Sequence, residues 1–370
     1  MDVIAIAQEL IKFRTETGNR EQINKCLQYC RNLLSGSGAI IEIIDFPHAS
    51  PVLYIRNRVV ENFDALCLGH IDVVPANDDM FIPQIKEGRL YGRGSLDMKS
   101  FAAVALNSME YVLKHNLNIN FAIILSTDEE KGSASTHAFL QSHPKISAKI
   151  VLDNDTGGDI CKIVSKCKNP VFVKINAIGQ EAHGSTPWDG IDANEILINT
   201  LAKIRKIYPY YSKTGIVPEN KWVDTMHIAK ICGGEVANVI CNASEALLDF
   251  RLTENSTVEN LQKNLNSCMI DGASYSIVSE STPVVMDENN ADILAYKKFA
   301  EEIMGKKIEF EHIGGATDSR AFAVKGSTVI MHSGSGEGMH TAGEYVEIET
   351  VRQIADIQIK FLEKVAQKKC

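Results

Sequence analysis

The segment DALCLGHID at residues 64–72 joins a run of apolar residues directly to a histidine and an aspartate. An apolar run of this length predicts a strand that is buried on both faces of a sheet. Three more runs of strand length recur at residues 120–125, 149–152 and 327–331. Helical patterns separate several of these runs. Strands that alternate with helices predict crossover connections, and therefore an α/β fold with a mostly parallel sheet flanked by helices.

The clearest helical pattern covers residues 99–114. One of its faces carries Ala102, Ala105, Leu106, Met109 and Leu113. Amphipathic patterns of the same period predict further helices at residues 1–14, 21–34, 133–141, 293–304 and 351–364.

The pattern changes between residues 170 and 281. Strands are expected at residues 170–177, 226–231 and 246–252, with helices at residues 194–206 and 258–269. This order predicts an inserted two-layer α+β domain of the β-α-β-β-α-β type. A chain of 370 residues also exceeds one ordinary core. We therefore expect a discontinuous first domain, residues 1–169 and 282–370, that is interrupted by an inserted domain at residues 170–281.

The composition excludes several classes of function. The net charge of -9, with 38 basic against 47 acidic residues, argues against a nucleic-acid partner. No apolar run is long enough to span a bilayer, so no membrane partner is expected. Nine cysteines occur without a C-x-x-C pair, which favours reduced thiols and a cytoplasmic location. A small-molecule substrate is the expected partner.

Residues that bind metals follow all four strand-like runs. The first run leads to His70, the second to the acidic turn STDEE (126–130), the third to DND (153–155) and the fourth, through a glycine-rich loop, to His340. Asp97 follows a tight loop just before the long helix. The carboxyl ends of parallel strands meet at one edge of a sheet, so we expect these residues to converge.

Two imidazoles and several carboxylates, without a thiolate, suit Zn, Mn or Co and exceed what one ion needs. A carboxylate between two such sets would bridge two metal ions about 3.5 to 4 Å apart. Sites of that kind activate water and polarise a carbonyl or phosphoryl oxygen, so hydrolysis is the natural use.

Six segments in order resemble the signature of one metallopeptidase and deacylase family. This family includes succinyl-diaminopimelate desuccinylase, acetylornithine deacetylase, aminoacylase, carboxypeptidase G and carnosinase-like dipeptidases. The segments are LGHIDVVP (68–75), YGRGSLDMKS (91–100), STDEEKGS (126–133), GQEAHGS (179–185), GGATDSR (314–320) and SGEGMHTAGEYV (335–346).

The resemblance implies a zinc-exopeptidase-like fold and a set of ligands for two divalent ions, zinc first, with cobalt or manganese as alternatives. His70 and Glu130 would hold one ion, Asp153 and His340 the other, with Asp97 and a hydroxide bridging the two. The family usually has Glu-Pro-Thr at the third strand end, or an Asp-Asn pair in its dipeptidase branch. Counting from the apolar run favours Asp153 as the ligand, with Asp155 as the alternative.

Further roles follow from the same resemblance. Glu129 would act as general base and acid, since a carboxylate that is not a ligand can move the proton. Asp72 would orient His70 and raise its basicity. In the inserted lid or dimerisation domain, His183 would stabilise the oxyanion, either in its own subunit or across a homodimer.

Three residues are candidates for binding the substrate carboxylate. Asn238 and Arg251 offer an amide and a guanidinium, which suit a carboxylate or an oxyanion. Arg320 is either a carboxylate clamp or a structural partner of Asp318.

Together these features predict a metal-dependent amidohydrolase in which the bridging hydroxide cleaves an N-acetyl or N-succinyl amino acid next to its free carboxylate. The first alternative is a dipeptidase or carboxypeptidase of the same family. The Asp153-Asn154 pair resembles dipeptidases, whereas ATDSR (316–320) resembles aminoacylases. An alternative of another class is a non-catalytic metal-binding or carboxylate-sensing protein, although Glu129 counts against it. A purely structural oligomer would leave the ligand-type residues unexplained.

Overall fold

The computed structural model describes residues 1–368, and these form two compact units. The first unit contains residues 1–165, residues 286–311 and the chain from Thr317 onward. The second contains residues 166–285 together with residues 312–316.

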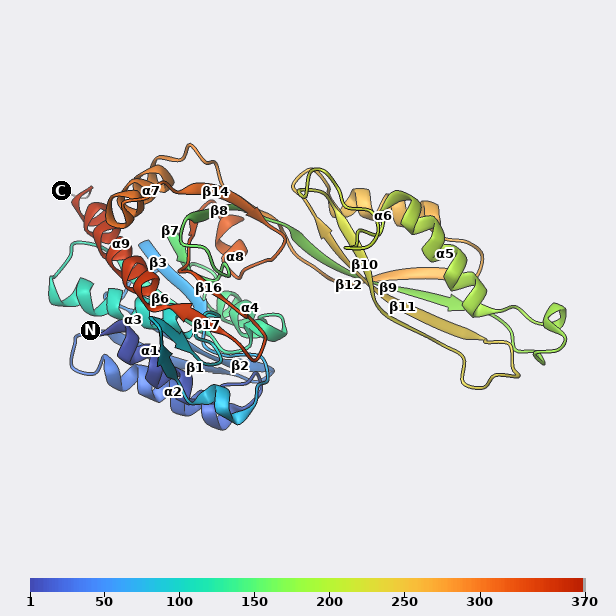
Figure 1. The fold of residues 1–370 in the computed structure, drawn as a ribbon, viewed down its shortest axis with the longest axis horizontal. Coiled ribbons are helices and arrows are strands. Elements are labelled where there is room, and N and C mark those ends of the chain that lie inside the picture. Colours follow the sequence, from blue (N-terminus) through green and yellow to red (C-terminus); the bar gives the residue numbers. More distant parts are fainter. Residues whose placement is uncertain (369–370) are drawn as a thin grey trace. The chain divides into compact units, whose positions relative to one another are not determined.

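A nine-stranded sheet forms the centre of the first unit (Figure 1). Its order is β1-β2-β6-β3-β7-β15-β8-β13, with β14 paired to β8. The strands are β1 (Ile40–Phe46), β2 (Ala49–Arg56), β3 (Asn62–His70), β6 (Phe121–Ser126), β7 (Ser147–Asp153), β8 (Lys162–Cys167), β13 (Val284–Val285), β14 (Glu309–Ile313) and β15 (Thr328–Met331). The four central strands β6, β3, β7 and β15 run parallel, and β1, β2, β8 and β13 pair antiparallel.

Helices cover both faces of this sheet, which is why its central strands are apolar throughout. One face carries α1 (Val3–Lys12), α2 (Arg20–Leu33), α3 (Lys99–Lys114), α7 (Ala291–Met304) and α9 (Ile348–Gln367), which share one apolar core with alternate residues of β3, β6 and β7. The other face carries α4 (Ala134–Ser142) and α8 (Arg320–Ala323). On that face the Phe139 ring of α4 packs edge-on against Tyr54 of β2.

A small second sheet of the first unit has the order β16-β17-β5-β4. It contains β4 (Gln84–Lys86), β5 (Arg89–Tyr91), β16 (Gly336–Glu337) and β17 (Tyr345–Glu347). Tyr345 pairs with Tyr91 across β17 and β5. This pairing brings the loop before α3 beside the loop before β17, although about 250 residues separate them. The short helices η1 (Asp78–Phe81) and η2 (Glu129–Lys131) complete the unit.

The second unit is a four-stranded antiparallel sheet with two helices and the order β10-β11-β9-β12. It runs β9 (Asn169–Ile178), η3 (Pro187–Asp189), α5 (Ala193–Ile207), β10 (Thr225–Gly233), β11 (Ala243–Leu252), α6 (Val258–Cys268) and β12 (Ala273–Glu280). Along β9 buried side chains alternate with more exposed ones, and the buried ones pack under α5 and α6. This is the pattern of a sheet covered on one face only.

The predicted α/β fold with a mostly parallel sheet and an inserted α+β domain is confirmed. Most predicted elements are found within three residues of their expected ends, and α3 has the expected bounds. Beyond the predicted runs the structure adds β2 and β8, whose mixed composition gives no uniform apolar run, and the short strands β4, β5, β13, β14, β16 and β17. β12 is the final strand of the β-α-β-β-α-β order predicted for the insert. Within residues 1–368, no helix has both the length and the apolar character needed to cross a membrane.

Candidate metal centre

The site is built where three neighbouring parallel strands end. His70 is the last residue of β3, Glu130 lies in the η2 turn after β6, and Asp155 lies two residues beyond β7. Because β6, β3 and β7 are adjacent and parallel, their carboxyl ends lie together. Asp97 comes from the loop between β5 and α3, and His340 from the loop between β16 and β17.

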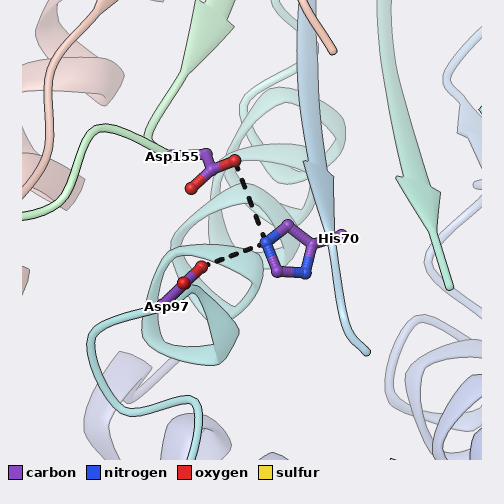
Figure 2. A group of neighbouring side chains, drawn as sticks. All are labelled: His70, Asp97 and Asp155. Atoms are coloured by element: carbon purple, nitrogen blue, oxygen red, sulfur yellow. Dashed lines mark hydrogen bonds and ion pairs between the residues drawn. The ribbon is translucent and has the colours of Figure 1, made fainter. Parts of the chain in front are cut away.

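The first ligand group consists of His70, Asp97 and Asp155. His70 Nε2 lies 3.1 Å from Asp97 Oδ1 and 3.9 Å from Asp155 Oδ2. Figure 2 shows both carboxylates approaching the same ring nitrogen. The ligand atoms of all three residues lie within 4.8 Å of one another, close enough for one ion to contact them all.

The second ligand group consists of Asp97, Glu130 and His340. His340 Nε2 lies 3.0 Å from Asp97 Oδ2 and 3.1 Å from Glu130 Oε2. Asp97 therefore belongs to both groups, with Oδ1 toward His70 and Oδ2 toward His340. A carboxylate with one oxygen in each group has the geometry of a bridging ligand.

Asp72 holds His70 and the acidic turn in place. His70 Nδ1 lies 3.0 Å from the Asp72 carbonyl oxygen and 3.4 Å from Asp72 Oδ1. Since both oxygens only accept, Nδ1 carries a hydrogen and Nε2 is the nitrogen left to bind a metal. Asp72 also accepts hydrogen bonds from the backbone of Glu129 and Glu130, and from the Thr17 hydroxyl at 2.7 Å.

The third strand end differs from the expectation. Asp155, and not Asp153, is in a ligand group. Asp153 Oδ1 accepts a hydrogen bond from the Asp155 backbone at 2.9 Å, and the carboxylate also bonds Thr317 and Ser319. Side chains alternate along a strand, so Asp153 shares its face of β7 with Val151, on the side covered by α8. Asp155 lies beyond the end of β7, where strand alternation no longer sets the side-chain direction, and its Oδ2 lies 3.9 Å from His70 Nε2.

The grouping of the ligands also differs from the one that the resemblance implied. His70 is grouped with Asp155 and not with Glu130, while His340 is grouped with Glu130 and not with Asp153. The contacts that define the two groups run through Asp97, whose Oδ1 lies 3.1 Å from His70 Nε2 and whose Oδ2 lies 3.0 Å from His340 Nε2.

The charges at this centre fit divalent cations. Burial and neighbouring carboxylates raise the pKa of Asp155 well above its usual value, and burial and Asp97 raise the pKa of Glu130. Burial opposes protonation of His70, but hydrogen bonds to Asp72 and Asp97 raise its pKa well above the usual value. Concentrated negative charge around two imidazoles is the donor set that borderline metal ions prefer.

Glu129 lies beside these residues but in neither group. Burial raises the pKa of Glu129 to about 8, although His70 acts in the opposite direction and Asp318 adds to the rise. A carboxyl group with this pKa exchanges its proton near neutral pH, as a general acid or base must.

The other predicted site residues belong to the second unit or to the edge of α8. His183 is exposed, and its Nδ1 accepts a hydrogen bond from the Ser185 backbone, so in the neutral ring the hydrogen is on Nε2. Gly184 N donates to the Asn238 carbonyl oxygen at 2.8 Å, which places the loops of His183 and Asn238 side by side. Arg251 makes a two-point ion pair with Asp249 on the same strand.

Arg320 begins α8 and donates from Nε to the Thr317 carbonyl oxygen at 2.6 Å. Asp318, its suggested structural partner, accepts a hydrogen bond from Thr136 at 2.6 Å.

Sequence reasoning assigned no supporting role to three buried polar residues: Asn154, Glu344 and Gln358. Glu344 lies within the quoted segment 335–346, four residues after His340. An acidic residue directly before the apolar pair Tyr345-Val346 was the available signal.

Comparisons with known proteins show the family and the fold to which this chain is similar. An acetylornithine deacetylase from Shigella sonnei is 25% identical over 317 residues, covering 80% of this chain and 79% of that protein. The crystal structure of an aminopeptidase from Bacillus cereus has a TM-score of 0.80 at 20% identity, covering 99% and 98% of the two chains. An M20 family metallo-carboxypeptidase from Sulfolobus solfataricus has a TM-score of 0.81 at 18% identity, covering 99% and 100%.

The family model described as peptidase family M20/M25/M40 matches residues 66–364, a span that contains every residue of both ligand groups. The chain therefore belongs to peptidase family M20/M25/M40, and it is a hydrolase of amide or peptide bonds.

Proposed function

We propose that this protein is a two-metal amidohydrolase that cleaves an N-acetyl or N-succinyl amino acid next to its free carboxylate. The observation that carries the proposal is the orientation of Asp97, with one carboxylate oxygen in each ligand group. A structural site for a single ion would not need a carboxylate shared in this way.

In the proposed site His70, Asp97 and Asp155 hold one divalent ion, and Asp97, Glu130 and His340 hold the other. Zinc is the first choice, and cobalt or manganese are alternatives, because the donors are imidazole and carboxylate. When bound, such ions lower the pKa of water and polarise a carbonyl oxygen.

Glu129 is the proposed general base and acid. Burial raises the pKa of Glu129, which favours a carboxylate that takes a proton from the attacking water and returns it to the leaving amine. Asp72 keeps Glu129 within reach, because its carboxylate accepts the Glu129 backbone hydrogen bond while it also contacts His70.

The proposal extends to the substrate. His183, with its hydrogen on Nε2, would donate to the oxyanion of the tetrahedral intermediate. Asn238, Arg251 and Arg320 would bind the substrate carboxylate. The acetylornithine deacetylase relative favours an N-acyl substrate. The dipeptidase or carboxypeptidase remains the alternative proposal, because the aminopeptidase and the carboxypeptidase share the fold of this chain.

Two further parts of the proposal rest on the sequence. We propose a cytoplasmic location, from the cysteine pattern, and a homodimer formed through the inserted domain. Light scattering on the purified chain measures whether it is a dimer.

The deciding experiment combines metal analysis with amine release from a panel of N-acetyl and N-succinyl amino acids and dipeptides, with and without a chelator. Two metal equivalents and chelator-sensitive release from an N-acyl amino acid support the proposal. Release from dipeptides alone favours the peptidase alternative. If the protein cleaves no panel member and Glu129→Gln leaves metal binding unchanged, the results favour a non-catalytic metal-binding or carboxylate-sensing protein.

A further inference from the structure

Glu344 is a buried carboxylate that no ligand group contains. Its side chain is shielded from solvent and lies against the loop that carries Asp97. Glu344 Oε1 accepts hydrogen bonds from the backbone of Leu96 at 2.9 Å and of Asp97 at 3.2 Å. Oε2 accepts from the backbone of Gly94 at 3.0 Å and from the Arg93 guanidinium.

These contacts use most of the acceptor capacity of the carboxylate. Three backbone N–H groups of one loop point inward at one anion because Gly94 adopts a positive φ of 83°, which turns the loop around it. Such nests bind anions well, and charged acceptors make the stronger kind of hydrogen bond. The loop of Asp97 is thus wrapped around the side chain of Glu344.

Glu344 also belongs to the segment that carries His340. The two residues are separated by a tight turn between β16 and β17, in which His340 itself has a positive φ of 61°. The Glu344 carbonyl oxygen accepts a hydrogen bond from Gly92 N at 3.2 Å, so backbone and side chain both hold the two loops together. The hydrogen bonds of Glu344 therefore join the loop that carries Asp97 to the loop that carries His340.

We propose that Glu344 is a positioning residue that fixes His340 against Asp97 and thereby determines whether the second ligand group, Asp97–Glu130–His340, can hold its metal ion. This inference rests on the proposed two-metal function. Glu344 touches neither ion. It acts by holding the Asp97 backbone and the His340 turn to each other.

The two groups respond unequally when Glu344 is changed. His70 is held by β3 and by Asp72, and Asp155 by the turn after β7, none of which contacts Glu344. His340 lies on the turn that ends at Glu344, where its neighbour Met339 packs against the core. A change at Glu344 therefore weakens the support of Asp97 alone in the first group, and of both Asp97 and His340 in the second.

The test is a titration of Zn²⁺ into metal-free protein by calorimetry, for the wild-type chain and for Glu344→Gln. The glutamine side chain would set an amide NH₂ against the backbone N–H groups and release the loop. We expect two binding steps in the wild type. In the variant the affinity of one step falls about 10- to 100-fold, as for other groups that support ligands, and the other step falls less than about tenfold.

Arg93→Gln is the matched control. It removes the partner of the same buried ion pair but leaves the three backbone hydrogen bonds to Glu344 in place. Its melting temperature falls, since a buried charge loses its partner, while both Zn²⁺ affinities stay within about threefold of the wild type. Glu344→Asp, which keeps the charge with a shorter reach, gives an intermediate loss and serves if Glu344→Gln does not fold.

Three results overturn the inference while leaving the two-metal function standing. They are two unchanged Zn²⁺ steps in both Glu344 variants, an equal loss at both steps, and the same unequal loss in Arg93→Gln. A wild-type chain that binds fewer than two Zn²⁺ ions instead contradicts the proposed function, so the two failures are distinguishable.

Discussion

The two ligand groups share Asp97 but are constructed differently. In the first group the ligands follow β3 and β7, and the His70 side chain is 1% exposed. In the second group the ligands come from turns, and the His340 side chain is 49% exposed. Rigid strand ends hold ligands more firmly than turns do, so we expect the first metal to be retained and the second to exchange.

The imidazoles show the same contrast. Asp72 contacts His70 Nδ1 through two oxygens, which fixes the ring and its tautomer. Among residues 1–368, His340 Nδ1 has no hydrogen-bond partner, and only Nε2 is engaged. The exposed ring is held mainly by what its Nε2 binds.

The most severe way to break this comparison is to remove the ligand that both groups share. Asp97→Asn should abolish binding of both metal ions and lower kcat/KM by about four orders of magnitude. Elemental analysis and turnover measure the two effects. Asp79→Asn, at an exposed aspartate on η1, is the control and should behave as wild type. Two metals retained in Asp97→Asn would show that Asp97 does not bridge.

Glu129→Gln tests the chemistry while both groups stay intact. Glutamine has the shape of glutamate but cannot take a proton, so we expect kcat to fall by about 10²- to 10⁴-fold. Metal content and KM should stay near the wild-type values, because Glu129 is in neither group. A loss of metal that accompanies the loss of kcat would instead place Glu129 among the ligands.

The two aspartates after β7 sharpen the definition of the first group. Asp155→Asn should weaken one Zn²⁺ step by about a hundredfold, since it removes a charged ligand next to His70. Asp153→Asn should change it by less than about tenfold, because asparagine still accepts the hydrogen bond from the Asp155 backbone. Calorimetry compares the two variants. The reverse order of effects would restore Asp153 as the ligand.

These aspartates also show where sequence reasoning ends. The strand ends, the family and the general position of the ligands could be predicted, because apolar runs and local motifs specify them. Between Asp153 and Asp155 lies Asn154, whose amide donates to the His332 carbonyl oxygen and accepts a hydrogen bond from Gln358, 204 residues away. No local pattern contains that contact.

Glu344 was missed for the same reason. Its hydrogen bonds reach residues 247 to 251 positions earlier in the chain. Conversely, α3 could be predicted to the residue, since its amphipathic pattern is complete within one segment. Local periodicity therefore gives the elements and the motifs, whereas the side chains that aim the ligands depend on tertiary contacts.

The smallest predicted effect concerns His332, which bonds Asn154, the residue between Asp153 and the ligand candidate Asp155. His332 is fully buried, with Nε2 2.7 Å from the Ile160 carbonyl oxygen, and its own carbonyl oxygen accepts the Asn154 amide. Burial lowers the pKa of His332 to about 4, although the bond to Ile160 opposes this. The folded state thus binds the proton more weakly than the unfolded state, whose histidine has a pKa of about 6.5.

A depressed pKa in the folded state gives stability that is fully present above about pH 6.5 and is lost as the pH falls toward 4. Between pH 7 and pH 5 this amounts to about 2 kcal/mol in the free energy of unfolding. His332→Gln keeps a donor for Ile160 but does not titrate. Denaturant unfolding of metal-free protein at both pH values should therefore show the wild type losing about 2 kcal/mol more than the variant. Equal losses in the free energy of unfolding of the two proteins would mean that protonation of His332 does not contribute to the loss of stability between pH 7 and pH 5.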